Sequence, residues 1–171
     1  EEDPVDDSFL GNTCKQWEDS VKIISTLGIR LITLRIGIVL NKRGGALLEF
    51  IKPARLGIAA ILGDGKQIVS WIHQQDLNAI VLFAITNKQI EGVYNAVSPE
   101  PISNKALTLN IAKHYHSWHI SINVPTLVLN VLLGEMSIEV LKSANVSSKK
   151  LENAQFSFQF PSISSALKQL L

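Results

Sequence analysis

The sequence lacks the features of a secreted, membrane-spanning or disulfide-stabilised protein. Cys14 is the single cysteine among 171 residues, which leaves no internal disulfide and no CxxC pair for a metal or for redox chemistry. The longest apolar runs, 80–85 and 126–133, fall far short of the roughly 20 residues that cross a bilayer. Neither run lies at the N-terminus behind basic residues, as a signal peptide would. We therefore predict a soluble, cytoplasmic protein with no membrane partner.

Charged residues are also scarce. Lys and Arg number 16 and Asp and Glu 15, so 18% of the chain is charged, against about 25% in an average soluble protein. With 46% apolar residues, this composition excludes a disordered chain, and the scattered Lys and Arg disfavour a nucleic-acid partner. The shortage of charge predicts that one face of the protein is covered by something other than water. Self-association of the chain is one expected consequence.

Hydrophobic periodicity predicts alternating helices and strands. The first helix is expected over 12–27, with Asn12 or Thr13 as its cap and Gly28 at its end. Further helices are expected over 46–51, from Asp76, over 104–116 with Ser103 as its cap, on either side of Gly134, and from Ser162 or Ser164. Strands are expected over 29–40, 92–97, 119–124 and 156–160. This order predicts an α/β fold with some parallel sheet, although only about three strands are convincing and the usual sheet has five or six.

Motifs that identify common catalytic folds are absent from the sequence. None of the ten glycines forms GxGxxG or a P-loop, and neither GxSxG nor HExxH occurs. His114, His116 and His119 do not predict a metal site, because no helix or strand places all three on one face. The segment 70–77 is more informative, since it brings an aromatic ring, an imidazole and a carboxylate close together. Spacing alone leaves two interpretations open, a packed junction or the wall of a pocket.

Several segments in a fixed order resemble one protein family. Residues 30–47, with the sequence RLITLRIGIVLNKRGGAL, resemble the LRxGxVLxxxGGAL segment of the epimerase-like branch of the extended short-chain dehydrogenases/reductases. Further matches follow in order: GDGKQ at 63–67, SWIHxxDL at 70–77, YNAxSPEP at 94–101 and LGEM at 133–136. The tail from Lys149 to Pro161 resembles the small C-terminal domain of this branch. The resemblance runs from about Phe9 to Leu171.

This resemblance implies an α/β fold with a partial Rossmann-like parallel sheet and a smaller C-terminal α+β domain on the substrate side. The expected division is 1–48 and 49–171, with a strand returning to the sheet near 92–97. The matched segments begin past the family's midpoint, so the glycine-rich loop is expected in a half that lies outside this chain. The start at Glu1 rather than Met agrees with that expectation. NADP or NAD is the implied cofactor, bound mostly by that other half.

The resemblance also implies roles for single residues. Gly37, Ile38 and Val39 match the strand end where the family's backbone meets the nicotinamide, so they are the expected cofactor-binding residues. Gly44 and Gly45 match a loop beside the substrate pocket.

Trp71 and His73 match the motif at the domain junction. They complete the expected substrate-binding set, with junction packing as the alternative interpretation. The Tyr and Lys of the family's Tyr-x-x-x-Lys pair correspond to Leu10 and Cys14, neither of which can replace them. The catalytic residues are therefore unknown.

Two functions agree with these observations. In the first, the chain is the C-terminal portion of an NAD(P)-dependent epimerase or reductase that moves a hydride at a carbonyl or hydroxyl carbon of a small molecule, with a nucleotide sugar as one candidate. In the second, it is a non-catalytic module that keeps a substrate- or partner-binding surface without the dinucleotide-binding half.

Overall fold

The computed structural model describes residue 1 and residues 6–171. It begins with helix α1 (Phe9–Val21) and the short α2 (Ile23–Thr26), which end at Gly28 in a left-handed conformation with φ of +71°. The predicted first helix is thus confirmed, but its predicted cap is wrong. Ser8 caps α1, because its hydroxyl accepts the amide of Gly11 at 3.2 Å. The helix therefore starts before Asn12 and Thr13.

The centre of the molecule is built from short parallel strand pairs. Strand β1 (Ile32–Ile36) pairs with β6 (Gly92–Ala96), and β2 (Ile38–Leu40) pairs with β5 (Trp71–His73). The predicted single strand over 29–40 is wrong, since it is divided at Gly37. Its hydrogen-bond partner changes there: the Gly37 amide donates to Ala96, whereas the Ile38 amide donates to the carbonyl of Ser70 at 2.9 Å. The chain thus changes its neighbouring strand at Gly37, from β6 to β5.

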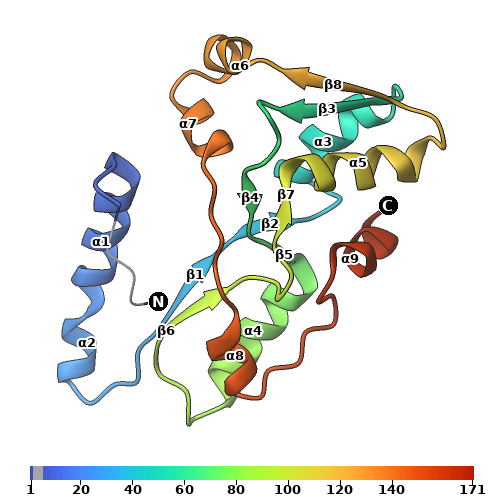
Figure 1. The fold of residues 1–171 in the computed structure, drawn as a ribbon. Helices are drawn as coiled ribbons and strands as arrows, with labels where there is room; N and C mark the ends of the chain where they lie inside the picture. The colour runs from blue at the N-terminus through green and yellow to red at the C-terminus, as the bar shows by residue number, and fades with distance from the viewer. Residues whose placement is uncertain (2–5) are drawn as a thin grey trace.

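Two further strand pairs lie beyond this centre (Figure 1). Strand β3 (Ile58–Leu62) runs parallel to β8 (Ile120–Val124), and β4 (Ile68–Val69) runs antiparallel to β7 (Ile102–Ser103). Within the described part of the chain every sheet has two strands. The α/β class with short parallel sheets is confirmed, and β6 returns to the sheet near 92–97 as expected. The division of the chain near residue 48 stays a prediction.

The remaining helices surround these strands. They are α3 (Ala46–Ala54), α4 (Gln74–Thr86), α5 (Asn104–Tyr115), α6 (Thr126–Leu133), α7 (Met136–Leu141), α8 (Lys149–Asn153) and α9 (Ile163–Leu170). Ser103 caps α5 and Ser162 caps α9, as predicted. Helix α3 is longer than expected, because Arg55 still donates its amide to Ile51 at 3.0 Å and the helix continues past Pro53. Helix α4 begins at Gln74, with His73 as its cap in place of Asp76.

Two apolar clusters form the core. The first joins the end of β2 to helices α3, α5 and α9, with Leu40, Leu47, Leu107 and Leu167 among its members. The second lies between the central strands, α4 and α8, and includes Phe156. The predicted strand over 156–160 is wrong, although its alternation reflects real packing: Phe156 and Phe158 meet edge to face with centroids 4.9 Å apart. This segment is irregular because the Gln159 and Phe160 amides bond to the Asp76 carboxylate instead of to a strand.

The first two helices stand to one side of the strands and expose much apolar surface (Figure 1). Phe9 is 83% exposed and Trp17 69%, and Ile23 and Leu27 are similarly open. Within the described residues, none of the helices is long and apolar enough to cross a membrane.

Candidate functional site

The carboxyl ends of the two central strand pairs form the candidate site. In open α/β sheets, ligands bind outside the carboxyl ends of the strands. Strands β1 and β6 run parallel and end together at Ile36 and Ala96, and Gly37 follows β1 directly. The residues predicted to meet the cofactor therefore lie at the edge of the sheet where a ligand is expected.

Gly37 has no room for a side chain. A Cβ placed there would stand 2.6 Å from the carbonyl oxygen of Ser70 and 2.8 Å from the side chain of Val97. Both distances are shorter than van der Waals contact. The sequence resemblance linked this glycine to the approach of a nicotinamide, whereas the structure shows a second reason, the close approach of its own chain at Ser70, the residue before β5.

The backbone around Gly37 presents an apolar edge. Ile36 is 53% exposed and Ile38 is 40% exposed, while Val39 packs against the second apolar cluster. The chain thus offers uncharged carbon surface on either side of a bare backbone segment.

The loop 41–45 follows β2 and carries the two predicted substrate-loop glycines. Asn41 and Gly44 form an isolated antiparallel bridge, and Gly45 starts α3 with φ of +74°. Gly44 lies in open space, since no atom stands within 4 Å of a Cβ built there. The geometry leaves room beside this loop.

A set of hydrogen-bonded side-chain amides lies beside this loop and was not predicted from the sequence. Asn41 donates to the Gln74 side chain at 3.4 Å, and Gln74 donates to Asn78 at 3.0 Å. This short chain of amides joins the loop after β2 to the first turn of α4. One signal could have found it, because Asn41 and Gln74 directly follow β2 and β5, two strands that pair with each other.

Trp71 lies inside the molecule. Its side chain is 0% exposed, belongs to the first apolar cluster, and donates its indole N–H to the carbonyl of Glu100 at 2.9 Å. In register Trp71 is opposite Ile38, so it supports the candidate edge from within the sheet. Its observed contacts are packing contacts.

His73 is buried as well, with 1% exposure, and both its ring nitrogens have partners. Nδ1 accepts the amide of Gln75 at 3.1 Å, so Nε2 carries the proton and donates to the side-chain oxygen of Gln169 at 3.0 Å. The ring of Phe160 lies 3.9 Å away, centroid to centroid. Burial lowers the pKa of His73 below its ordinary value, against the opposing effects of Gln169 and Asp76. His73 is therefore a neutral junction residue in this structure.

Leu10 and Cys14, at the positions of the family's Tyr and Lys, lie one helical turn apart on α1, and both are exposed. The same helix is tied to β1 by a two-pronged ion pair in which Arg35 donates to both carboxylate oxygens of Glu18 at 2.8 Å. The Arg35 guanidinium holds the pKa of Glu18 below its ordinary value. The ion pair thus fixes a helix that carries no proton donor at the expected position.

The polar side chains that hold the C-terminal segment were also missed. Asp76 is 0% exposed, and its two carboxylate oxygens accept the amides of Gln159 and Phe160 at 2.8 and 2.9 Å. Ser98 donates to the carbonyl of Pro161 at 2.8 Å. Sequence spacing suggested only a helix-start role for Asp76, because its partners lie more than 80 residues away.

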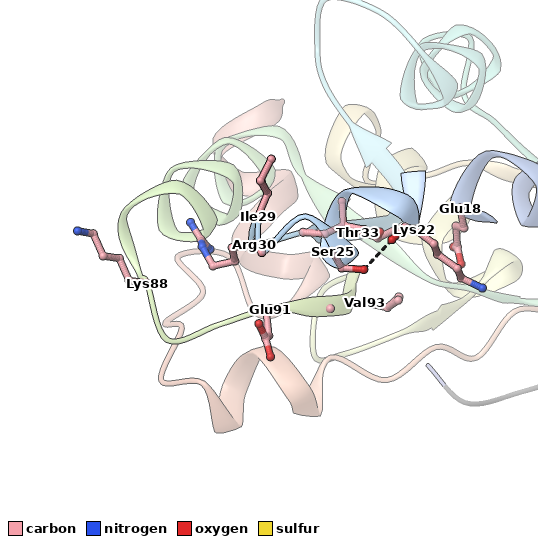
Figure 2. Close-up of a pocket in the computed structure, with 12 residues that line it drawn as sticks. Glu18, Lys22, Ser25, Ile29, Arg30, Thr33, Lys88, Glu91 and Val93 are labelled. Carbon is pink, nitrogen blue, oxygen red and sulfur yellow. Dashed lines mark hydrogen bonds between the residues drawn. The ribbon is translucent and has the colours of Figure 1, made fainter. Parts of the chain in front are cut away.

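A second hollow of about 650 Å³ lies at the opposite end of the sheet (Figure 2). It is bordered by the ends of α1 and α2, the start of β1 and the start of β6. Figure 2 shows Lys22 and Lys88 at its two ends. Arg30 is already engaged, since it donates to the carbonyls of Ala84 and Ile90. This hollow faces the amino ends of the strands, so we do not assign the candidate site to it.

The described residues contain no cluster of three His, Cys, Asp or Glu side chains that could hold a metal ion. Of the histidines in the sequence cluster, His116 bonds through its ring to the carbonyl of Arg55 at 2.9 Å.

Comparison with known proteins gives consistent matches over most of the chain. The profile of a domain of unknown function, DUF1731, matches residues 124–170. An epimerase family protein of Staphylococcus aureus is 34% identical over 163 residues, which cover 95% of this chain and 54% of that protein. The epimerase family protein YfhF of Bacillus subtilis is 33% identical over 166 residues, 97% of this chain and 54% of its own length. The chain thus spans about half the length of the curated relatives that it matches.

Solved structures give the same picture. The human epimerase family protein SDR39U1 (isoform 2), solved with NADPH, superposes with a TM-score of 0.87 at 26% identity and covers 96% of this chain and 56% of that one. A nucleoside-diphosphate sugar epimerase from Corynebacterium glutamicum superposes with a TM-score of 0.78 at 29% identity, over 99% of this chain and 32% of that one. A UDP-N-acetylglucosamine 4-epimerase from Bacillus cereus, at 17% identity and a TM-score of 0.76, shares the fold.

Proposed function

Because the chain belongs to the epimerase-like branch of the extended short-chain dehydrogenases/reductases and corresponds to the C-terminal portion of its relatives, we propose that it supplies the substrate-facing side of an NAD(P)-dependent epimerase or reductase. The reaction would transfer a hydride between the nicotinamide and a carbonyl or hydroxyl carbon of the substrate. The nicotinamide cofactor supplies that redox chemistry when bound. The residues of this chain would position the substrate and shield the reacting carbon from water.

The observation that carries this proposal is the backbone edge at Gly37. A bare strand end between the exposed Ile36 and Ile38, at the carboxyl end of a parallel pair, fits one face of an uncharged planar ring. We therefore propose Gly37, Ile38 and Val39 as the contacts to the nicotinamide. The same edge offers no glycine-rich loop for the pyrophosphate, since none of the chain's glycines forms GxGxxG. The fit is with the nicotinamide end of NAD or NADP alone, and which of the two binds stays open.

The proposed substrate is a nucleotide sugar, bound beside Gly44 and Gly45. Support comes from the open space at Gly44 and from the amides of Asn41 and Gln74, which can donate and accept hydrogen bonds as sugar hydroxyls require. The C. glutamicum structure is described as a nucleoside-diphosphate sugar epimerase, which favours the same class of substrate. Trp71 and His73 would support this site from the interior, by holding β5 against β2.

A second candidate function is a non-catalytic binding module. It is favoured by Leu10 and Cys14, because leucine has no proton to give and a neutral thiol cannot replace the lysine's charge. In that case the loop 41–45 would bind a sugar nucleotide or a partner without turnover. The exposed apolar residues of α1 and α2 also support self-association of the isolated chain.

A hydride-transfer assay separates these two functions. The chain would be joined to the N-terminal half of the 34% identical S. aureus relative, and the product incubated with NADPH or NADH and a set of UDP- and GDP-linked keto-sugars. Oxidation of the reduced cofactor at 340 nm that depends on the sugar would support the enzyme. Binding of the sugar nucleotide with no oxidation of either cofactor would support the module.

A further inference from the structure

The C-terminal part of the chain crosses the central strands as a strap, defined here as residues 143–171 (Figure 1). Ser70 holds its first part, since its hydroxyl donates to the carbonyl of Ala144 at 2.7 Å and accepts the amide of Val146 at 2.9 Å. Asp76 holds its middle through the amides of Gln159 and Phe160. All these contacts come from polar groups of a single short segment, 70–76. The strap is therefore held by hydrogen bonds from this segment, in addition to the packing of its apolar residues, such as Leu151 and Leu167, in the two clusters.

His73 lies in the same segment and fastens the end of the strap. Its Nε2–H donates to Gln169 on α9, and its ring lies against Phe160. At the same time its Nδ1 caps α4 by accepting the amide of Gln75. One buried imidazole thus joins the first turn of α4 to the last helix of the chain, and each ring nitrogen has a fixed role.

A second proton on this ring would break the arrangement. Protonated Nδ1 becomes a donor, and it would then face the Gln75 amide and the positive end of the α4 dipole. The Asp76 carboxylate on the same helix attracts an imidazolium, but burial outweighs this attraction. The other groups on the ring, Phe160 and Gln169, carry no charge, and the cation of α9, Lys168, is exposed. A charged ring would therefore turn from its pocket toward water.

Helix α9 connects this event to the candidate site. Its residues Ala166, Leu167 and Leu170 pack in the first apolar cluster with Leu40 and Leu47. Leu40 ends β2 and Leu47 lies in the first turn of α3, so these two residues flank the loop 41–45. If α9 leaves, both ends of that loop lose the part of this packing that α9 supplies, while the part supplied by α5 remains.

We propose that His73 is an acid-sensitive latch, whose protonation releases α9 and the middle of the strap and thereby loosens the loop 41–45. The inference rests on the geometry of His73 and holds whether or not the proposed enzyme function is correct. The direction follows from linkage: because burial lowers the pKa of His73 in the folded chain, the unfolded or released chain takes up the proton first. The latch therefore holds fully above the ordinary histidine value of about 6.5 and weakens as the pH falls below it.

Amide hydrogen exchange of the wild-type chain between pH 7.5 and 5.0 tests the latch. Protection factors, corrected for the intrinsic pH dependence of exchange, are measured for Gln159, Phe160 and the α9 amides. The β3 and β8 amides serve as an internal reference. We expect protection in the strap to fall by up to about tenfold per pH unit below 6.5, while the reference changes less than about twofold. Constant protection in the strap, or an equal fall in both regions, would overturn the proposal.

Two variants assign the effect to this ring. His73→Asn keeps a side-chain cap for α4 but cannot titrate, so its strap protection should be independent of pH. Gln169→Glu is isosteric at an exposed position and places a carboxylate against the ring, so the protonated ring stays docked and the fall should shrink to less than about twofold. If His73→Asn fails to fold, Gln169→Glu alone decides. If Gln169→Glu still shows the full pH-dependent loss of protection in the strap, the proposal of a His73 latch is wrong.

Discussion

The carboxylate of Asp76 holds the backbone of Phe160 in place, because its Oδ2 accepts the Phe160 amide at 2.9 Å. Its Oδ1 accepts the neighbouring Gln159 amide at 2.8 Å. Asp76 is fully buried, in the first turn of α4, and the segment that it holds has no strand partner. The segment with the alternating phenylalanines is thus held in place by a side chain rather than by a sheet. The SWIHxxDL motif in this chain is the place where the C-terminal segment docks.

Replacement of Asp76 should therefore be among the most destabilising polar substitutions. Asp76→Ala leaves two amides without acceptors, and each hydrogen bond to a charged group contributes about 1.5–3 kcal/mol. We expect the free energy of unfolding, measured by urea titration, to fall by about 3 kcal/mol or more. Glu91→Gln, at an exposed position before β6, is the control and should change it by less than about 0.5 kcal/mol. Equal effects of the two substitutions would contradict the docking role of Asp76.

The two predicted site glycines Gly37 and Gly44 should differ in how strongly alanine destabilises the protein at each position. Gly37→Ala forces a Cβ against the Ser70 carbonyl at 2.6 Å, and such overpacking costs about 1–3 kcal/mol. Gly44→Ala adds a methyl group in open space, so its stability should stay within about 0.5 kcal/mol of the parent. Thermal melting of both variants under the same conditions compares them. A Gly37→Ala protein as stable as Gly44→Ala would show that Gly37 does not lie as close to the Ser70 carbonyl as described.

Replacement of Gln155 by glycine should stabilise the folded protein. It is the one described non-glycine residue with positive φ, +66°, and it lies just after α8. A left-handed conformation costs an ordinary residue about 1 kcal/mol, which glycine does not pay. We expect Gln155→Gly to raise the free energy of unfolding by up to about 1 kcal/mol. Asn153→Gly, at the last residue of α8, is the matched control and should lower it by about 0.3 kcal/mol.

The ion pair between Glu18 and Arg35 should give a small stabilisation that depends on pH. Both side chains are partly exposed, so Glu18→Gln should cost at most about 1 kcal/mol at pH 7. Because Arg35 lowers the pKa of Glu18, this contribution is present above the ordinary glutamate value and is lost as the pH falls through the lowered one. Glu49→Gln removes the exposed pair with Lys52 and is the control with almost no expected effect. A Glu18→Gln difference that is the same at pH 3 and pH 7 would contradict the pairing.

Local signals in the sequence predicted much of the fold. The Ser103 and Ser162 caps, the end of the first helix at Gly28 and the strand near 92–97 were found because each depends on neighbouring residues. The order of the motifs indicated the family, and the site that this resemblance implies at Gly37 stays a prediction. These predictions needed no knowledge of distant contacts.

The predictions from sequence were wrong where contacts between residues far apart in the sequence determine the local structure. The alternation of 156–160 predicted a strand, yet the amides there bond to Asp76. The run 29–40 was interrupted because its partner changes at Gly37, which no local pattern reveals. For Trp71 and His73 the sequence left substrate binding and junction packing open, and the structure places both side chains inside the molecule, where β5 pairs with β2 and His73 contacts Gln169 of the C-terminal segment. Their expected contact with a substrate stays a prediction.

The most direct test of the account is the titration of NADPH into two proteins by isothermal calorimetry. One is this chain alone, and the other is this chain joined to the N-terminal half of the S. aureus relative. If the chain supplies only the nicotinamide edge at Gly37, it should show no saturable binding at up to about 1 mM, whereas the joined protein should bind in the micromolar range. Saturable micromolar binding by the chain alone, or no binding by a folded joined protein, would contradict the account.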